Sequence, residues 1–225
     1  CVITVYVGLR ERFSYYMSTA CYLHILVINM IYFTATSITI ARFYCLKFSH
    51  SEDKIMQYSK KLEALASVDA LTGLFNRRHM NKHLEELERD YFNASQPFSI
   101  VIGDIDFFKK INDTYGHDAG DYVLTEISKL FLRFMKGKGE VARWGGEEFL
   151  FSFEGDNADF VFVELHNLRT LIKSHEFKYK DTLIQVTVTF GLEEYDSGIG
   201  LENTITRADA KLYTGKVEGR DRVVY

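Results

Sequence analysis

Residues 143–149 read Arg143-Trp-Gly-Gly-Glu-Glu-Phe149, with strand-forming sequence on both sides. Residues Glu140–Trp144 and Glu147–Phe153 are predicted to be strands, and Gly145-Gly146 is predicted to be a two-residue hairpin turn between them. Two carboxylates directly after two glycines place hard oxygen ligands beside a backbone that a phosphate can approach closely. The stretch therefore predicts an antiparallel hairpin with a binding site near its tip.

Strand and helix patterns alternate around this hairpin. A short apolar strand enters through a proline, and the longer segments repeat their apolar residues at helical spacing. Hairpins mixed with strand–helix crossovers predict a sheet with helices on its faces, of class α/β or α+β. The expected elements are helices at Arg77–Phe92, Asp118–Met135, Asn157–Lys173 and Leu201–Lys216, and strands at Ser99–Ile105 and Thr182–Leu192.

Two more groups of residues suggest chemistry. Gly103-Asp104-Ile105-Asp106 ends the buried strand, where a carboxylate is costly unless it is paired or bound to metal. Lys216 and Arg220, four residues apart, are suited to binding phosphate. Carboxylates for magnesium and cations for a triphosphate are the components of metal-assisted phosphoryl transfer. Each feature alone has an ordinary alternative: a glycine turn, a strand end or a solvated pair of cations.

Four segments together resemble the GGDEF family of diguanylate cyclases, in the family's order and spacing, over about residues 67–225. The resemblance implies a fold like that of the class III nucleotide cyclases and polymerase palms, with a central antiparallel-rich sheet flanked by helices. The segments are Asp69-Ala-Leu-Thr-Gly-Leu-Phe-Asn-Arg-Arg78, Asp104-Ile-Asp-Phe-Phe-Lys-Lys-Ile-Asn-Asp-Thr-Tyr-Gly-His-Asp-Ala-Gly-Asp121, Arg143-Trp-Gly-Gly-Glu-Glu-Phe149 and Ala208-Asp-Ala-Lys-Leu-Tyr213.

The resemblance implies a metal site. Asp104 and Glu147, helped by the backbone carbonyl of Ile105, would hold two Mg²⁺ ions per active site, with Mn²⁺ as the alternative metal. Glu148 would assist the metal site or deprotonate the attacking 3′-hydroxyl. Asp104, Glu147 and Glu148 are therefore the expected catalytic residues.

The same motifs imply how GTP is bound. Asn112 and Asp121 would read the guanine edge, because a carboxylate accepts from guanine N1–H and N2–H₂, donors that adenine lacks. Asp69 and Arg78 are interpreted as a structural turn. The other expected nucleotide contacts are His117 beside the nucleotide and, at the β- and γ-phosphates, Phe107, Phe108, Lys109, Lys216 and Arg220.

The implied activity is condensation of two GTP into cyclic di-GMP and two pyrophosphates in bacterial second-messenger signalling. Each domain would hold half a site, so a homodimer is required and cyclic di-GMP receptors are the downstream partners. Two alternatives remain: an inactive domain that binds GTP as a regulatory module, and a relaxed cyclase that makes cyclic GMP-AMP. The intact hairpin and Asp104 favour the active enzyme, and Asp121 favours guanine.

The sequence departs from the family at three places. Many relatives have an Arg-x-x-Asp product-inhibition motif where this chain reads Lys136-Gly-Lys-Gly139, and lysine cannot form the bidentate clamp of arginine. Weak or absent inhibition at that site is therefore expected. Gly215 replaces a frequent alanine, and Phe190 is bulkier than usual.

The N-terminal part predicts a membrane region at residues 1–47. Phe13–Ala41 contains no Asp, Glu, Lys or Arg over 29 residues, and a helix of that length exceeds the ~30 Å hydrocarbon core of a bilayer. The expected span is at about residues 18–41. Cys1–Leu9 would be the end of a preceding span and Arg10–Arg12 a tight loop. The alternative is a buried helix of a soluble domain.

Basic residues predict the orientation of this span. Five lie between Arg42 and Lys61, against two in the Arg10–Arg12 loop, so the positive-inside rule places the C-terminal part in the cytoplasm. The expected location is the inner (cytoplasmic) membrane of a bacterium, with the lipid bilayer as a partner.

Residues 48–68 are predicted to be a helical connector to a cyclase domain at residues 69–225. Ile55, Tyr58, Leu62 and Leu65 form an apolar seam at 3-4-3 spacing. Two heptads are too few to distinguish a coiled coil from an amphipathic helix that lies on its own domain.

Composition limits the remaining classes. The 225 residues have a formal net charge of −4, so no nucleic-acid partner is expected. The three cysteines all precede Leu46 and have no zinc-ligand spacing. The chain begins with Cys rather than Met, so it is expected to be a fragment of a longer protein.

Overall fold

The computed structural model describes residues 2–65, 67–94 and 96–225, and it divides into a unit of residues 1–65 and a unit of residues 66–225. The first unit is one helix, α1 (Val2–Leu65), of 64 residues. Arg10–Arg12 is helical, so the tight loop expected there is absent. Arginine and glutamate are good helix formers, and no proline interrupts this stretch.

One segment of α1 is long and apolar enough to cross a membrane, by length and composition. It runs from Cys21 to Cys45, with a mean hydropathy of 1.7, and none of its most apolar window is buried. This segment overlaps the span expected at residues 18–41. The side chains of Ile55, Tyr58, Leu62 and Leu65 lie outside those that the structure describes, so the apolar seam stays a prediction.

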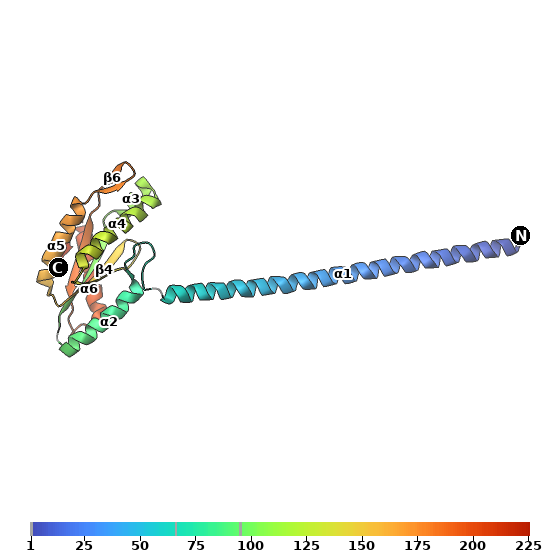
Figure 1. Ribbon diagram of the computed structural model, residues 1–225, viewed down its shortest axis with the longest axis horizontal. Helices are drawn as coiled ribbons and strands as arrows, with labels where there is room; N and C mark the ends of the chain where they lie inside the picture. Colours follow the sequence, from blue (N-terminus) through green and yellow to red (C-terminus); the bar gives the residue numbers. More distant parts are fainter. Residues whose placement is uncertain (1, 66, 95) are drawn as a thin grey trace. The chain divides into compact units, whose positions relative to one another are not determined.

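A six-stranded mixed sheet forms the centre of the second unit (Figure 1). The strand order is β1-β3-β4-β2-β7-β8, with antiparallel pairs in the middle and a parallel pair at each edge. This confirms the antiparallel-rich sheet. The strands are β1 (Phe75–Asn76), β2 (Phe98–Ile105), β3 (Gly139–Arg143), β4 (Glu148–Glu154), β7 (Val188–Glu194) and β8 (Val223–Val224).

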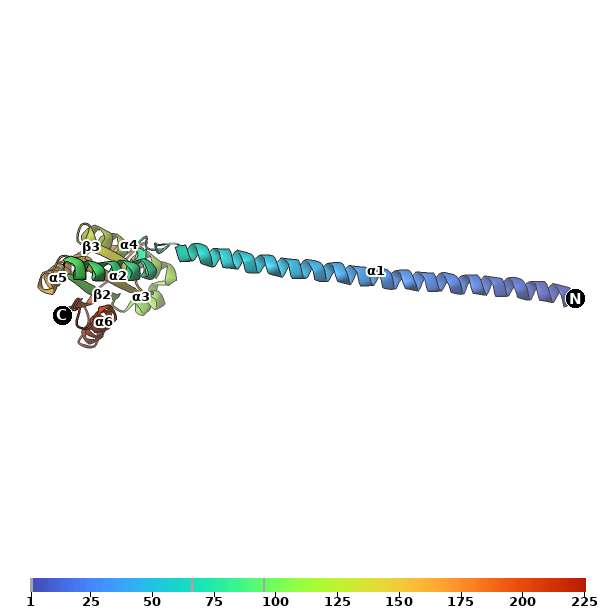
Figure 2. The same cartoon turned by 90° about the horizontal axis from the view of Figure 1, so that it is seen from below.

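Helices cover both faces of this sheet, and in Figure 2 α2 lies in front of the strands. The four predicted helices are confirmed within two residues at each end. A short helix, α3, and a separate two-stranded sheet were not predicted. The elements are α2 (Arg77–Ala94), α3 (Phe108–Tyr115), α4 (His117–Met135), α5 (Ala158–Ser174), α6 (Leu201–Val217), β5 (Phe177–Tyr179) and β6 (Thr182–Ile184).

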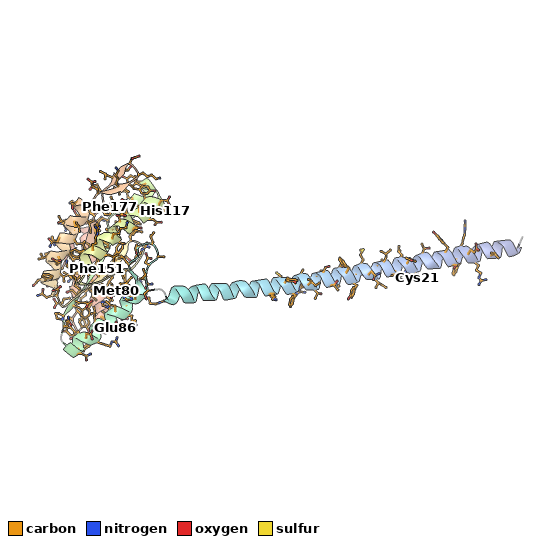
Figure 3. All side chains as sticks on the ribbon, viewed as in Figure 1. Cys21, Met80, Glu86, His117, Phe151 and Phe177 are labelled. Atoms are coloured by element: carbon orange, nitrogen blue, oxygen red, sulfur yellow. The ribbon has the colours of Figure 1, made fainter. Side chains whose placement is uncertain are left out.

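The core has two clusters, one on each face of the sheet. All eight residues of β2 are buried, and because side chains alternate along a strand, Ile100 and Ile102 join one cluster while Val101 joins the other. Met80 of α2 belongs to the first cluster and Phe151 of β4 to the second (Figure 3). A strand covered on both faces is a rigid base for charged groups at its end.

The hairpin loop between β3 and β4 is longer than predicted. The Trp144 N–H donates to the Glu148 carbonyl oxygen at 2.8 Å, whereas a two-residue turn would pair Trp144 with Glu147. Three residues, Gly145–Glu147, therefore form the loop. Glu147 is the last residue of this loop and precedes β4 instead of belonging to a strand.

The strand predicted at Thr182–Leu192 is two strands. β6 pairs with β5 in the small sheet, and β7 joins the large sheet. Thr187, in the segment between these two strands, forms two hydrogen bonds with Asp106. The Asp106 N–H donates to the Thr187 carbonyl oxygen at 2.9 Å, and the Asp106 carboxylate accepts from the Thr187 hydroxyl at 2.7 Å. The backbone bond continues the β2–β7 register, in which Ile105 pairs with Val188, by one residue. The chain therefore changes sheets between Ile184 and Thr187.

Candidate active site

Asp104 lies near the end of β2, opposite Glu148 on one neighbouring strand and Thr189 on the other. Its side chain is almost fully buried, and the Lys216 ammonium lies 2.8 Å from Oδ2. Burial raises the pKa of Asp104 above its usual range, and the nearby Glu148 charge adds to this, although Lys216 opposes it. A single lysine therefore compensates the Asp104 charge incompletely.

The hairpin loop brings a second carboxylate to the same place. The Ile105 N–H donates to the Glu147 carbonyl oxygen at 3.3 Å, which ties the loop to the end of β2. Burial, followed by the Asp104 charge, raises the pKa of Glu147. The structure thus brings together Asp104, Glu147 and Glu148 and leaves this corner with an excess of negative charge.

This donor set fits a hard divalent cation. Carboxylate oxygens are the ligands that Mg²⁺ takes from proteins, usually one or two carboxylates with the substrate's phosphates. Over residues 2–65, 67–94 and 96–225, no group of three or more His, Cys, Asp or Glu side chains forms a ready-made metal cluster. The fit therefore depends on Asp104 and Glu147 and on their uncompensated charge.

A polar corner lies between α3 and α4. Asn112 Oδ1 is buried and has no hydrogen-bond partner, so it is an acceptor available to a donor from a ligand. It lies so close to Gly120 that a Cβ on that residue would be 1.9 Å away. Asp121 and His117 are exposed at the start of α4, and His117 lies at one end of the unit (Figure 3).

The N-terminus of α3 follows directly after β2, because Phe108 lies three residues after Ile105. Phe107 precedes this helix in the left-handed conformation, at φ 56°, and its side chain does not cap the helix. The first N–H groups of a helix have no intrahelical acceptor and suit an anion. Lys109 is exposed, whereas Phe108 is 7% exposed and packs in the core, so only its backbone is available to a phosphate.

Lys216 and Arg220 meet this corner from α6 and the turn after it. Lys216 contacts Asp104, and the Arg220 guanidinium carbon lies 4.4 Å above the centre of the Phe107 ring. The two cations are thus beside the carboxylate pair and beside the α3 N-terminus. Residues from two separate parts of the chain, 107–109 and 216–220, thus meet through the contact of Arg220 with Phe107.

Comparison with known proteins agrees with this geometry. The family model for the diguanylate cyclase GGDEF domain matches residues 66–222. The chain belongs to the GGDEF family of diguanylate cyclases.

Solved structures and curated relatives support the same assignment. The GGDEF domain of DgcB from Caulobacter crescentus in complex with c-di-GMP has 32% identity and a TM-score of 0.68, covering 71% of this chain and 95% of that one. The structure of the DgcB coiled coil and GGDEF domain has 29% identity and the same TM-score, covering 79% and 96%. Diguanylate cyclase DgcM of Escherichia coli K12 is 32% identical over 80% of this chain, which spans only 43% of that relative.

Two peripheral features of this GGDEF domain have structural explanations. Asp69 Oδ1 accepts from the Thr72 N–H and hydroxyl at 2.9 and 2.7 Å and lies 3.2 Å from Arg143, which supports the predicted structural turn. In the Lys136–Gly139 stretch, Lys138 forms an ion pair with Glu164 of α5. That lysine is occupied within the domain.

A cavity of about 460 Å³ lies between α3 and the β6–β7 connection of the GGDEF domain. Lys110, Tyr115 and Gln185 are among its lining residues, but Asp104, Asn112 and Asp121 are not. Asp106 and Phe107 also line the cavity, so it adjoins the N-terminus of α3 but does not include the carboxylate of Asp104 or the predicted guanine contacts.

Sequence reasoning missed the role of Asp106. Its carboxylate is buried and accepts from the Thr187 and Thr189 hydroxyls at 2.7 and 2.6 Å and from the Asp221 N–H at 3.0 Å. The signal was present, because a second aspartate follows the buried strand. Its partners, however, lie 81 to 115 residues away in sequence.

Proposed function

We propose that this GGDEF domain is an active diguanylate cyclase that condenses two GTP molecules into cyclic di-GMP and two pyrophosphates. The observation that supports activity most is the intact acidic corner, where Asp104 and Glu147 lie beside Lys216 with too little positive charge. A degenerate domain would be expected to have lost Asp104 or the Gly-Gly-Glu-Glu-Phe hairpin, and both are intact in this sequence. Folding does not explain the acidic corner, because buried uncompensated carboxylates lower stability.

The guanine base would bind between α3 and α4. Asn112 Oδ1 is a buried acceptor without a partner, and Asp121 would accept from N1–H and N2–H₂ of guanine. His117 would border the nucleotide. A site built from acceptors rejects a base without matching donors, because its polar groups would be left unpaired.

The triphosphate would lie against the α3 N-terminus. Backbone N–H groups of Phe107, Phe108 and Lys109 would bind the β- and γ-phosphates, and the Lys109, Lys216 and Arg220 side chains would add positive charge. Two Mg²⁺ ions bound by Asp104, Glu147 and the Ile105 carbonyl would lower the pKa of the 3′-hydroxyl and neutralise phosphate charge.

Glu148 would accept the 3′-hydroxyl proton or support the metal ligands. Each 3′-oxygen would attack the α-phosphorus of the GTP held by a partner subunit and release pyrophosphate. Because one domain supplies half of this arrangement, the enzyme would act as a homodimer.

Product analysis tests this function and its alternatives. The purified chain is incubated with Mg²⁺ and GTP, or with GTP and ATP, and products are identified by mass spectrometry. Cyclic di-GMP is the expected product in both mixtures. Bound GTP without any product would indicate a regulatory module, and cyclic GMP-AMP in the mixed reaction would indicate a relaxed cyclase.

The N-terminal helix would anchor the enzyme in the bacterial inner membrane. The Cys21–Cys45 segment is apolar enough to span it, and the basic residues after Ala41 favour a cytoplasmic catalytic domain. The seam of Ile55, Tyr58, Leu62 and Leu65 would pair two subunits as a coiled coil. If so, Leu62→Glu with Leu65→Glu lowers turnover but leaves GTP binding to one subunit intact.

A further inference from the structure

The turn after α6 has an unusual backbone. Arg220 and Asp221 have φ angles of 63° and 46°, and Phe107, whose ring Arg220 covers, has φ 56°. Such angles are uncommon for residues other than glycine, and for a bulky residue they raise the free energy of the folded backbone. Surrounding contacts must therefore hold this turn in place.

Those contacts converge on the backbone around Arg220. The Arg220 N–H donates to the Gly215 carbonyl oxygen at 2.9 Å. The Asp221 N–H donates to buried Asp106 at 3.0 Å, and Asp106 is itself fixed by Thr187 and Thr189. One side of the turn is thus tied to the end of β2, which carries Asp104.

Helix α5 holds the other side. Arg169 Nη1 donates to the Asp221 carbonyl oxygen at 2.8 Å and to its Oδ1 at 2.9 Å. Lys173, one turn further along α5, donates to Oδ2 at 2.6 Å. Burial alone would raise the pKa of Asp221, but Lys173 and Arg169 outweigh it and lower that pKa, so the carboxylate stays charged. Because Arg169 binds a main-chain oxygen, it fixes the backbone next to Arg220.

We propose that Asp221, held by Arg169 of α5 and by Asp106, is a positioning residue that sets Arg220 for the β- and γ-phosphates. The inference rests on the proposed function, because it assumes that Arg220 contacts those phosphates. Arg169 and Asp221 act only through Arg220 and touch no substrate. Their loss changes recognition of the terminal phosphates and leaves base recognition unchanged.

The test compares two nucleotides on the full chain. One is a GTP analogue with a methylene bridge between the α- and β-phosphorus atoms, which cannot release pyrophosphate, and the other is GMP, which lacks the terminal phosphates. Arg169→Met is expected to raise the Kd of the analogue about tenfold, which is within the range of coupling between residues of one network. The Kd of GMP should stay unchanged. Lys129→Met is the matched control, because Lys129 pairs only with Glu126 within α4 among the ion pairs described.

A double-mutant cycle separates positioning from general damage. In an Arg220→Ala background, Arg169→Met should cause no further loss of analogue affinity. An equal loss with and without Arg220, an equal loss for GMP, or an equal loss in Lys129→Met would overturn the proposal. If the unaltered chain fails to bind the analogue, the proposed function fails instead, so the two failures are distinguishable.

Discussion

Asp104 and Asp106 lie two residues apart at the end of β2, and their surroundings are opposite. The Asp106 carboxylate accepts three hydrogen bonds from two hydroxyls and a backbone N–H. Asp104 has one cationic partner, Lys216, and faces the charge of Glu148. The Asp106 carboxylate thus has enough hydrogen-bond donors, whereas the Asp104 carboxylate has too little positive charge around it.

The difference separates structure from chemistry. A buried carboxylate with enough donors fixes the chain around it, as Asp106 fixes β7 and the turn after α6. A buried carboxylate with too few partners costs free energy in the folded protein until a cation binds it. The same residue type therefore has two roles on one strand, and the following variants test the distinction.

The largest effect on activity is expected from a change at Asp104, whose charge is compensated incompletely. Asp104→Asn keeps the shape of the side chain and removes its charge. We expect the initial rate of cyclic di-GMP formation to fall more than about a hundredfold, because loss of outer-shell metal partners alone costs 10–100-fold. Asp90→Asn, on the exposed face of α2, is the control. A rate within the error of that control would remove Asp104 from the catalytic site.

Gly120→Ala tests the polar corner between α3 and α4, where the guanine base is proposed to bind. A Cβ there would be 1.9 Å from Asn112 Oδ1 and 3.1 Å from the Phe108 ring, so the amide must move. Binding of the non-cleavable GTP analogue should become weaker by roughly 1–3 kcal/mol of binding free energy, the cost of leaving a polar group in the site unpaired. This is measured as a higher Kd. Unchanged affinity would show that Asn112 is not in contact with the nucleotide.

The satisfied carboxylate, Asp106, is expected to matter for stability. Asp106→Asn replaces one carboxylate oxygen by an NH₂ group, which donates and cannot accept. The remaining oxygen can therefore serve only one of the two sides now occupied by Thr187 and Thr189. The free energy of unfolding should fall by about 1–3 kcal/mol, which is about 2–4 °C of Tm per kcal/mol at this size. Thermal unfolding followed by circular dichroism measures it. A Tm equal to that of the unaltered protein would mean that the Asp106 bonds contribute nothing net.

The smallest effect is expected far from β2. Lys136–Gly139 has no acidic partner for a guanine base, and Lys138 is already paired with Glu164. Added cyclic di-GMP at micromolar concentration should change the initial rate by less than about twofold, since lysine cannot form a bidentate clamp. Strong non-competitive inhibition would show that another pocket binds the product.

Much of the fold could be predicted from local patterns. The helices α2, α4, α5 and α6 have clear apolar spacing, and β2 is a short apolar run. The three-residue hairpin loop could not be predicted, because Gly145-Gly146 is equally suited to a two-residue turn. The separation of β6 from β7 could not be predicted either, because it depends on their pairing partners: β6 pairs with β5, and β7 pairs with β2 from another part of the chain.

The candidate site was predictable where its motifs are contiguous. Asp104, Glu147 and Lys216 were assigned from the family motifs, and the structure brings them together. The roles of Asp106 and Arg169 were not predicted, because each binds residues 52 to 115 positions away. Whether a buried polar group has enough hydrogen-bond partners depends on the folded chain. A single segment of the sequence does not show it.

Thermal unfolding of the metal-free full chain tests the comparison most directly. Because the pKa of Asp104 is raised in the folded protein, its charge costs stability once the pH exceeds 3.8, its ordinary value. At pH 7 we expect Asp104→Asn to raise the Tm and Asp106→Asn to lower it, and the gain from Asp104→Asn should shrink as the pH falls towards 4. A lower Tm for Asp104→Asn at pH 7 would contradict the account, because Asp104 would then be a satisfied structural carboxylate like Asp106.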